Sequence, residues 1–164
     1  MNRIAGAFLA VSIAASATPT AAADNPLLGT WKLKSFVREV AATGERYNER
    51  GEHPNGYLSY SADGRMYAII TWGDRVAPRD VVPTDAERIK LYSSMIAYAG
   101  TYTLDAEKVV HHVDTSWNQN WTGTDQVRFY KLDGNTLTIT SALAKNFTDG
   151  REGRSILVWE KLAP

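Results

Sequence analysis

Three pairs of strand-like segments joined by tight turns are the feature that most constrains how this chain can fold. The segments are rich in β-branched and aromatic residues, and the joints at residues 61–64, 105–108 and 133–136 contain the Asp, Gly and Asn residues that tight turns favour. Two further strands are predicted at residues 30–40 and 154–162. Short strands separated by tight turns predict an all-β fold, an antiparallel up-and-down β-barrel.

One short helix is expected among the strands, over residues 84–98. Thr84 and Glu87 have the spacing of a capping box, in which each side chain bonds a free backbone N–H group of the first turn. Apolar residues then recur at helical spacing, and Gly100 suits the exit from the helix. A parallel sheet would need several such helices as crossovers, so the antiparallel barrel is preferred. We expect the helix to cover one opening of the barrel, and the side chains that would line this opening are Tyr92, Met95 and Tyr98.

Residues 1–23 have the pattern of a secretory signal peptide. Arg3 is followed by an apolar stretch over residues 4–15 and by the alanine run 21–23. The apolar stretch is too short to span a bilayer as a helix. We therefore expect cleavage after the alanine run, export to a periplasmic or secreted location, and one folded domain over residues 24–164.

The composition excludes several classes of protein. The chain has 18 Lys and Arg residues against 18 Asp and Glu residues, without a basic cluster, so it lacks the charge pattern of a nucleic-acid-binding protein. It contains no Cys, which excludes disulfides and zinc–thiolate sites. No membrane-spanning segment and no phosphate-binding, dinucleotide-binding or serine-hydrolase motif is present. We expect no cofactor, and a monomer because a closed barrel leaves no edge strand to cover.

The first and last strands of the predicted domain resemble those of a known protein family. Gly29-Thr30-Trp31 looks like the Gly-x-Trp opening strand of lipocalin and fatty-acid-binding barrels, and Trp159-Glu160-Lys161 resembles their last strand, where a basic residue packs across that tryptophan. With the ordered motifs in between, residues 25–162 are similar to bacterial and fungal lipocalin-like domain proteins, a family of mostly unassigned function. Many relatives have Arg in place of Lys161. Because lysine lacks a planar guanidinium, we expect weaker packing at this point.

The hairpin turns predict which side chains face the barrel interior. A four-residue loop in the last hairpin pairs Tyr130 with Ile139. Arg128 and Gln126 lie on the same face because side chains alternate along a strand, and the aliphatic residues of that face identify it as the inner one. A slip of one residue in the register would reverse these assignments.

The middle hairpin is treated in the same way. A four-residue loop pairs Tyr102 with His111, so His111 is expected to face inward while His112 and Asp114 face outward. Adjacent strand residues point to opposite faces, so the two histidines cannot share a metal ion. His112 and Asp114 supply only two of the three or four ligands that a metal site needs, and we expect a solvated surface and no metal.

The inward assignments place polar groups inside an otherwise aliphatic barrel. Arg128 has no carboxylate on its own face, and an unpaired buried charge is unfavourable. One hypothesis is that a ligand with a polar or anionic head, such as a carboxylate or phenolate, supplies its partner. The alternative is that Arg128 lies at the barrel mouth, solvated or bonded to backbone carbonyls. We therefore predict binding of a small, mainly hydrophobic ligand, and the predicted ligand-binding residues are Tyr98, Tyr102, His111, Trp121, Gln126, Arg128 and Tyr130.

Four tryptophans are assigned from their positions. Trp31 and Trp159 are expected in the core, whereas Trp117 and Trp121 lie on a loop where aromatic rings could close over a ligand. For Trp117, packing beneath the loop is preferred. For Trp121 both roles stay open.

Two other functions are considered. In a catalytic hypothesis, His111 acts as general acid or base while Arg128 and Tyr102 stabilise a developing oxyanion, as in an isomerase or cyclase acting on an enolisable carbonyl compound. No motif requires this chemistry, and a binding protein is preferred. A module that binds protein partners through its loops has only the loop aromatics in its favour.

Overall fold

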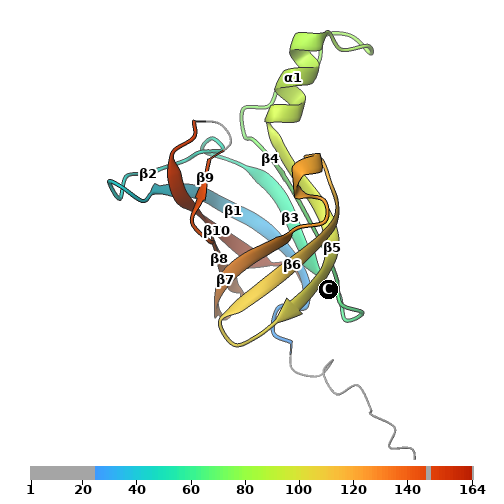
Figure 1. Ribbon diagram of the computed structural model, residues 1–164. Helices are drawn as coiled ribbons and strands as arrows, with labels where there is room; N and C mark the ends of the chain where they lie inside the picture. The colour runs from blue at the N-terminus through green and yellow to red at the C-terminus, as the bar shows by residue number, and fades with distance from the viewer. Residues whose placement is uncertain (1–24, 147–148, 164) are drawn as a thin grey trace, which may run out of the picture.

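The computed structural model describes residues 25–146 and 149–163, which form a closed eight-stranded antiparallel β-barrel (Figure 1). The predicted all-β barrel is confirmed. The expected signal peptide at residues 1–23 lies outside the described residues. No helix in the described segments is long and apolar enough to cross a membrane.

Eight strands form the wall of the barrel, and pairing of β1 with β10 closes it. They are β1 (Gly29–Val40), β3 (Asn55–Tyr60), β4 (Arg65–Thr71), β5 (Met95–Leu104), β6 (Lys108–Ser116), β7 (Asp125–Asp133), β8 (Thr136–Ser141) and β10 (Glu152–Lys161). Two short strands extend the sheet beyond the wall. These are β2 (Arg46–Tyr47), beside β1, and β9 (Ala144–Lys145), beside β10.

The two ends of the barrel differ in how the strands are connected. Tight turns join β3 to β4, β5 to β6 and β7 to β8 at one end, as the sequence predicted. The longer connections follow β1, β4, β6 and β8 and lie at the other end, which we call the mouth (Figure 1). They carry β2, β9, the helix α1 (Asp85–Ser93) and the 3-10 helix η1 (Gln119–Trp121). Side chains from distant parts of the sequence therefore meet at the mouth.

The end opposite the mouth is filled by the core. Trp31 and Leu27 are completely buried, and the Trp31 Nε1–H donates to the Leu27 carbonyl at 2.8 Å. Lys161 Nζ lies 5.2 Å from the centre of the Trp31 ring, in the contact that the family resemblance predicted. Trp159 is also buried, so both tryptophans are core residues, as expected. These side chains fill the end of the barrel opposite the mouth.

Both predicted hairpin registers are confirmed. Tyr130 pairs with Ile139, and Tyr102 pairs with His111. Ile139 and His111 are buried, which shows that the inner face was assigned correctly. His112 is on the outer face, where its Nδ1 lies 2.7 Å from Asp125 Oδ1.

The predicted helix is too long. The capping box of Thr84 and Glu87 is present, but α1 ends at Ser93 and the chain enters β5 at Met95. Ile96 and Tyr98 are buried on alternate positions of this strand because they face the interior between β4 and β6. None of the side chains of α1 is buried, and the helix projects from the rim of the mouth (Figure 1). The expectation that this helix covers the opening of the barrel is therefore wrong.

Gly100 is likewise not a helix exit but lies inside β5, at a bulge in the pairing with β6. A Cβ atom at this position would lie 2.0 Å from the carbonyl oxygen of His112, which is far closer than such atoms approach. A glycine is therefore required because the backbones of the two strands come together here.

We expect Gly100→Ala to lower the free energy of unfolding by about 1–3 kcal/mol, because the new methyl group forces the two strands apart. Urea denaturation checks this. Thr101→Ala, at the next and exposed position of β5, is the control and should change stability by less than about 0.5 kcal/mol. An unchanged midpoint for Gly100→Ala would contradict the close contact.

Candidate functional site

A cavity of about 260 Å³ lies inside the mouth of the barrel. Its apolar walls come from β1, β4, β5, β10 and η1, which contribute Phe36, Ile70, Tyr98, Ile96, Leu157 and Trp121. Polar side chains of the lining come from β1, β7, β8, β9 and β10 and from the connections after β1 and β8. Mostly apolar walls with a few placed polar groups are typical of a small-molecule site.

The structure brings four of the seven predicted ligand-binding residues to this cavity. They are Tyr98, Trp121, Gln126 and Arg128. The other three, Tyr102, His111 and Tyr130, are not among its lining residues. No α1 residue lines the cavity either, so the predicted role of Tyr92 at the opening is not observed.

Arg128 lies on the cavity wall without an ion pair in the described part of the chain. Its Nη1 donates to the carbonyl of its neighbour Val127 at 2.9 Å, and its Nη2 donates to Gln126 Oε1 at 3.3 Å. Gln126 Nε2 in turn donates to Thr124 Oγ1 at 3.0 Å. The guanidinium is thus held in place by neutral acceptors, and its charge stays uncompensated at the cavity surface.

Two aromatic side chains pack edge to face beside the cavity. The rings of Tyr98 and Trp121 are 5.5 Å apart, and Trp117 packs edge-on against Trp121 at 5.0 Å. Trp117 does not itself line the cavity, in agreement with the preferred packing role, whereas Trp121 does. Trp117 also contacts Tyr92 of α1, with 6.4 Å between the ring centres.

His111 is completely buried between two tyrosines. Its Nε2 lies 2.8 Å from the Tyr60 hydroxyl, and its Nδ1 lies 3.0 Å from the Tyr98 hydroxyl. Burial lowers the pKa of His111 well below its ordinary value, and the nearby charge of Arg128 acts in the same direction. Burial also raises the pKa of Tyr98, although Arg128 opposes that rise. His111 is therefore neutral and acts on the cavity only through Tyr98.

Tyr102 and Tyr130 make their polar contacts with turns and with the N-terminal segment. The Tyr102 hydroxyl donates to the Ser61 carbonyl at 2.9 Å and accepts from Asn25 Nδ2 at 2.7 Å. The Tyr130 hydroxyl donates to the Asp105 carbonyl at 2.9 Å. These partners lie at the end opposite the mouth. The structure consequently does not bring Tyr102 to the cavity wall that carries Arg128, as the catalytic hypothesis required.

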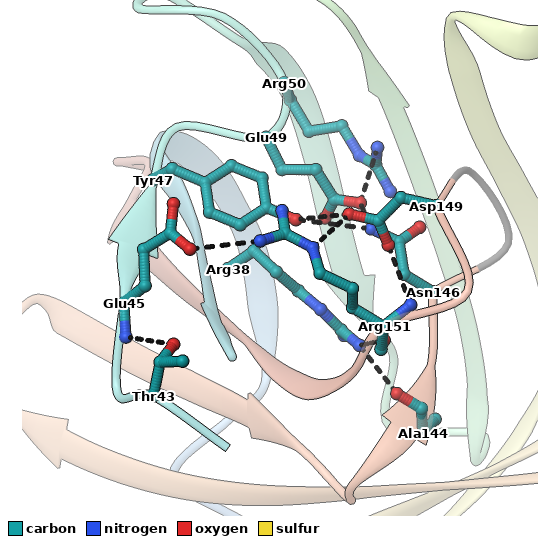
Figure 2. Close-up of polar contacts among 10 residues, drawn as sticks. All are labelled: Arg38, Thr43, Glu45, Tyr47, Glu49, Arg50, Ala144, Asn146, Asp149 and Arg151. Atoms are coloured by element: carbon teal, nitrogen blue, oxygen red, sulfur yellow. Dashed lines mark hydrogen bonds and ion pairs between the residues drawn. The ribbon is translucent and has the colours of Figure 1, made fainter. Parts of the chain in front are cut away.

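The sequence analysis missed a buried charge pair at the mouth. Arg50 and Glu49 lie in the connection after β2, yet only 4% of the Arg50 side chain and 6% of the Glu49 side chain are exposed. Arg50 Nη1 lies 3.1 Å from Glu49 Oε1 (Figure 2). The Arg50 guanidinium also lies over the rings of Phe36 and Trp72, at 5.0 and 4.1 Å from their centres. Burial lowers the pKa of Arg50 to about 10, so it remains charged at neutral pH.

Two further buried polar residues complete this mouth cluster. Asn146 Nδ2 donates to Glu49 Oε1 at 2.6 Å (Figure 2). Arg38 Nη2 donates to the Ala144 carbonyl at 2.6 Å. Glu49, Arg50, Arg38 and Asn146 all line the cavity, and together they tie the connection after β1 to the connection after β8.

A β-bulge explains why Arg38 was missed. The pairing of β1 with β10 shifts between Leu33 and Ser35, so the strict alternation that starts at Trp31 is broken there. After the bulge, Phe36 and Arg38 face inward, whereas alternation without it would place Arg38 outside. A bulge of this kind leaves no clear signal in the sequence. The nearest sequence signal was the concentration of charged residues between 38 and 50.

The comparisons identify the family. A family model described as a lipocalin-like domain matches residues 28–162. The chain belongs to this family. It is also 32% identical over 87 residues to the 4'-hydroxy-3'-methoxypropiophenone carrier protein ppsC of Aspergillus oryzae, an alignment that covers 48% of this chain and 78% of that relative. A ligand-binding barrel is the common feature that the family and this relative support.

The buried histidine should make the stability of this lipocalin-like barrel depend on pH. In the unfolded chain His111 binds a proton below its ordinary pKa of 6.5, whereas in the folded protein its pKa is lowered. The stability that neutral His111 supports is thus fully present above pH 6.5 and is lost as the pH falls toward the folded-state pKa. The expected slope is at most about 1.4 kcal/mol per pH unit.

Urea denaturation between pH 5 and pH 7 checks this slope in the wild type and in His111→Gln. The variant should be less stable at pH 7 and should lose less stability on acidification, because its side chain does not titrate. His53→Gln removes an exposed histidine and should leave the wild-type slope unchanged. Equal slopes in the wild type and His111→Gln would contradict the assignment.

Proposed function

We propose that this protein binds one small, mainly hydrophobic molecule with a polar or anionic head group in the cavity at the barrel mouth. The observation that carries the proposal is Arg128, a guanidinium on the cavity wall that forms no ion pair among the described residues. A charge held this way gains from a ligand oxygen that accepts its hydrogen bonds. The aromatic and aliphatic walls would bury the rest of the molecule.

The volume of the cavity limits the size of the ligand. It measures about 260 Å³, and pockets for drug-sized ligands measure about 300–1,000 Å³. A compound with one aromatic ring and short substituents fits this space better than a long fatty acid. The name of the Aspergillus relative gives a compound of this size as its cargo, which supports the same class of ligand here.

Binding without catalysis is the function that the geometry favours. The catalytic hypothesis needs His111 at the substrate, but Tyr98 stands between His111 and the cavity. The lowered pKa of His111 also makes its protonated form scarce at neutral pH, so it is a poor general acid. A carrier needs no general acid or base at the ligand.

We also propose that the protein is exported, on the strength of the signal-peptide pattern in residues 1–23. A carrier in an exported compartment would hold a poorly soluble molecule there. The mass of the exported protein checks this, because cleavage after the alanine run leaves a chain that begins at Asp24.

Calorimetric titration with 4'-hydroxy-3'-methoxypropiophenone tests the role of Arg128. Arg128→Met keeps an unbranched side chain about as long as the aliphatic part of arginine but removes the charge and the donors, and we expect it to weaken binding by about 10-fold to 100-fold. The matched control is Lys131→Met, which makes the same change of charge at an exposed position of β7. Unchanged affinity in Arg128→Met would show that Arg128 does not hold the head group.

A further inference from the structure

We propose that Glu49 accepts a hydrogen bond from a neutral hydroxyl group of the bound molecule, so that the barrel selects ligands with a hydroxyl donor at one end. This inference rests on the proposed ligand-binding function and assigns a second polar contact to it. Glu49 would fix the donor end of the ligand while Arg128 fixes an acceptor, such as a carbonyl oxygen, elsewhere on it.

The first argument is the unequal use of the two carboxylate oxygens. Oε1 of Glu49 accepts a hydrogen bond from Asn146 Nδ2 at 2.6 Å and forms an ion pair with Arg50 Nη1 at 3.1 Å. Oε2 is buried and has no hydrogen-bond partner among the described residues. A buried carboxylate oxygen without a donor is unfavourable, so this atom is expected to find one when the cavity is filled. Glu49 lines the cavity but its Oε2 has almost no accessible surface, so a ligand supplies that donor if the carboxylate turns toward the cavity when it is filled.

The second argument is the charge around Glu49. Arg50 is held between Phe36 and Trp72 and is already paired with Oε1, so it cannot turn to serve a ligand anion. An anionic group beside Oε2 would meet a carboxylate at close range and be repelled. A neutral hydroxyl is the group that Oε2 accepts without this cost, and its hydrogen bond to a charged acceptor is stronger than a neutral one.

The third argument is the position of the two polar contacts. Arg128 comes from β7, whereas Glu49 comes from the connection after β2, next to Arg50, whose guanidinium lies over Phe36 of β1 and over Trp72 just after β4. In the barrel wall, β8 and β10 separate β7 from β1. Both residues nevertheless line the same cavity, whose other walls are aromatic and aliphatic. The ligand class that fits is therefore a small hydroxylated aromatic compound with a carbonyl acceptor away from its hydroxyl group.

The alternative is that Glu49 only anchors the mouth cluster. Glu49 also borders a second pocket, beside Tyr47 and Asp149, and its Oε2 would then have no part in binding. In that case the presence of a hydroxyl group on the ligand would not affect affinity.

Two compounds that differ only at the hydroxyl group distinguish a Glu49 that binds the ligand from a Glu49 that only anchors the mouth cluster. We compare 4'-hydroxy-3'-methoxypropiophenone with 3',4'-dimethoxypropiophenone by calorimetric titration of the whole protein near pH 6, where the phenol is neutral. The wild type should bind the hydroxyl compound about 10-fold or more tightly than the dimethoxy compound. Equal affinities would overturn the role of Glu49 and leave the ligand-binding function standing. Binding of neither compound would contradict the proposed function for this class of ligand, and the inference would fall with it.

Two variants and a change of pH test whether Glu49 causes the preference for the hydroxyl compound. Glu49→Gln should reduce the preference for the hydroxyl compound to within about 3-fold, whereas Glu45→Gln, in the same connection but outside the cavity, should keep the wild-type preference. A preference that survives in Glu49→Gln would overturn the assignment. Raising the pH until the phenol ionises should weaken binding to the wild type. Stronger binding of the phenolate would overturn the inference and show that the hydroxyl end belongs to Arg128.

Discussion

Strand β1 carries the constraint on which the rest of the structure depends. It pairs with β3 on one side and with β10 on the other, so it closes the barrel, and it contains a bulge between Leu33 and Ser35. Before the bulge, Trp31 fills the end of the barrel opposite the mouth. After the bulge, Phe36 and Arg38 face the mouth interior. A single strand thereby builds both the solid half of the core and one wall of the cavity.

The arginine side chains that line the cavity have different kinds of hydrogen-bond and ion-pair partners. Arg38 donates to a backbone carbonyl, and Arg50 is paired with Glu49 and covered by two aromatic rings. Arg128, in contrast, has only neutral acceptors in the part of the chain that the structure describes. Because charges buried in this way are stable only with partners, the structure separates groups that hold the connections together from groups left available to a ligand. Arg128 and the second oxygen of Glu49 belong to the latter kind.

Local sequence patterns predicted the features of the fold that depend on interactions between residues close together in the sequence. The capping box of Thr84, the inward face of His111 and the registers of two hairpins followed from residue types and turn lengths. The end of α1 did not, because the alternating segment after Ser94 becomes a strand only through its pairing with β4 and β6. The family resemblance located the barrel, but neither it nor alternation indicated the mouth cluster. Glu49 and Arg50 lie in a connection whose burial depends on the segment after β8, nearly a hundred residues later.

The central claim is that the mouth cavity holds a small molecule. Native mass spectrometry of the protein, purified without denaturation from its own cells and culture medium, tests this claim most directly. The account predicts one adduct of defined mass, lost on denaturation, that corresponds to a small hydroxylated aromatic compound. The adduct should be absent from Arg128→Met and retained by Lys131→Met. A wild-type protein that carries no adduct and acquires none from a panel of small aromatic ketones would contradict the claim.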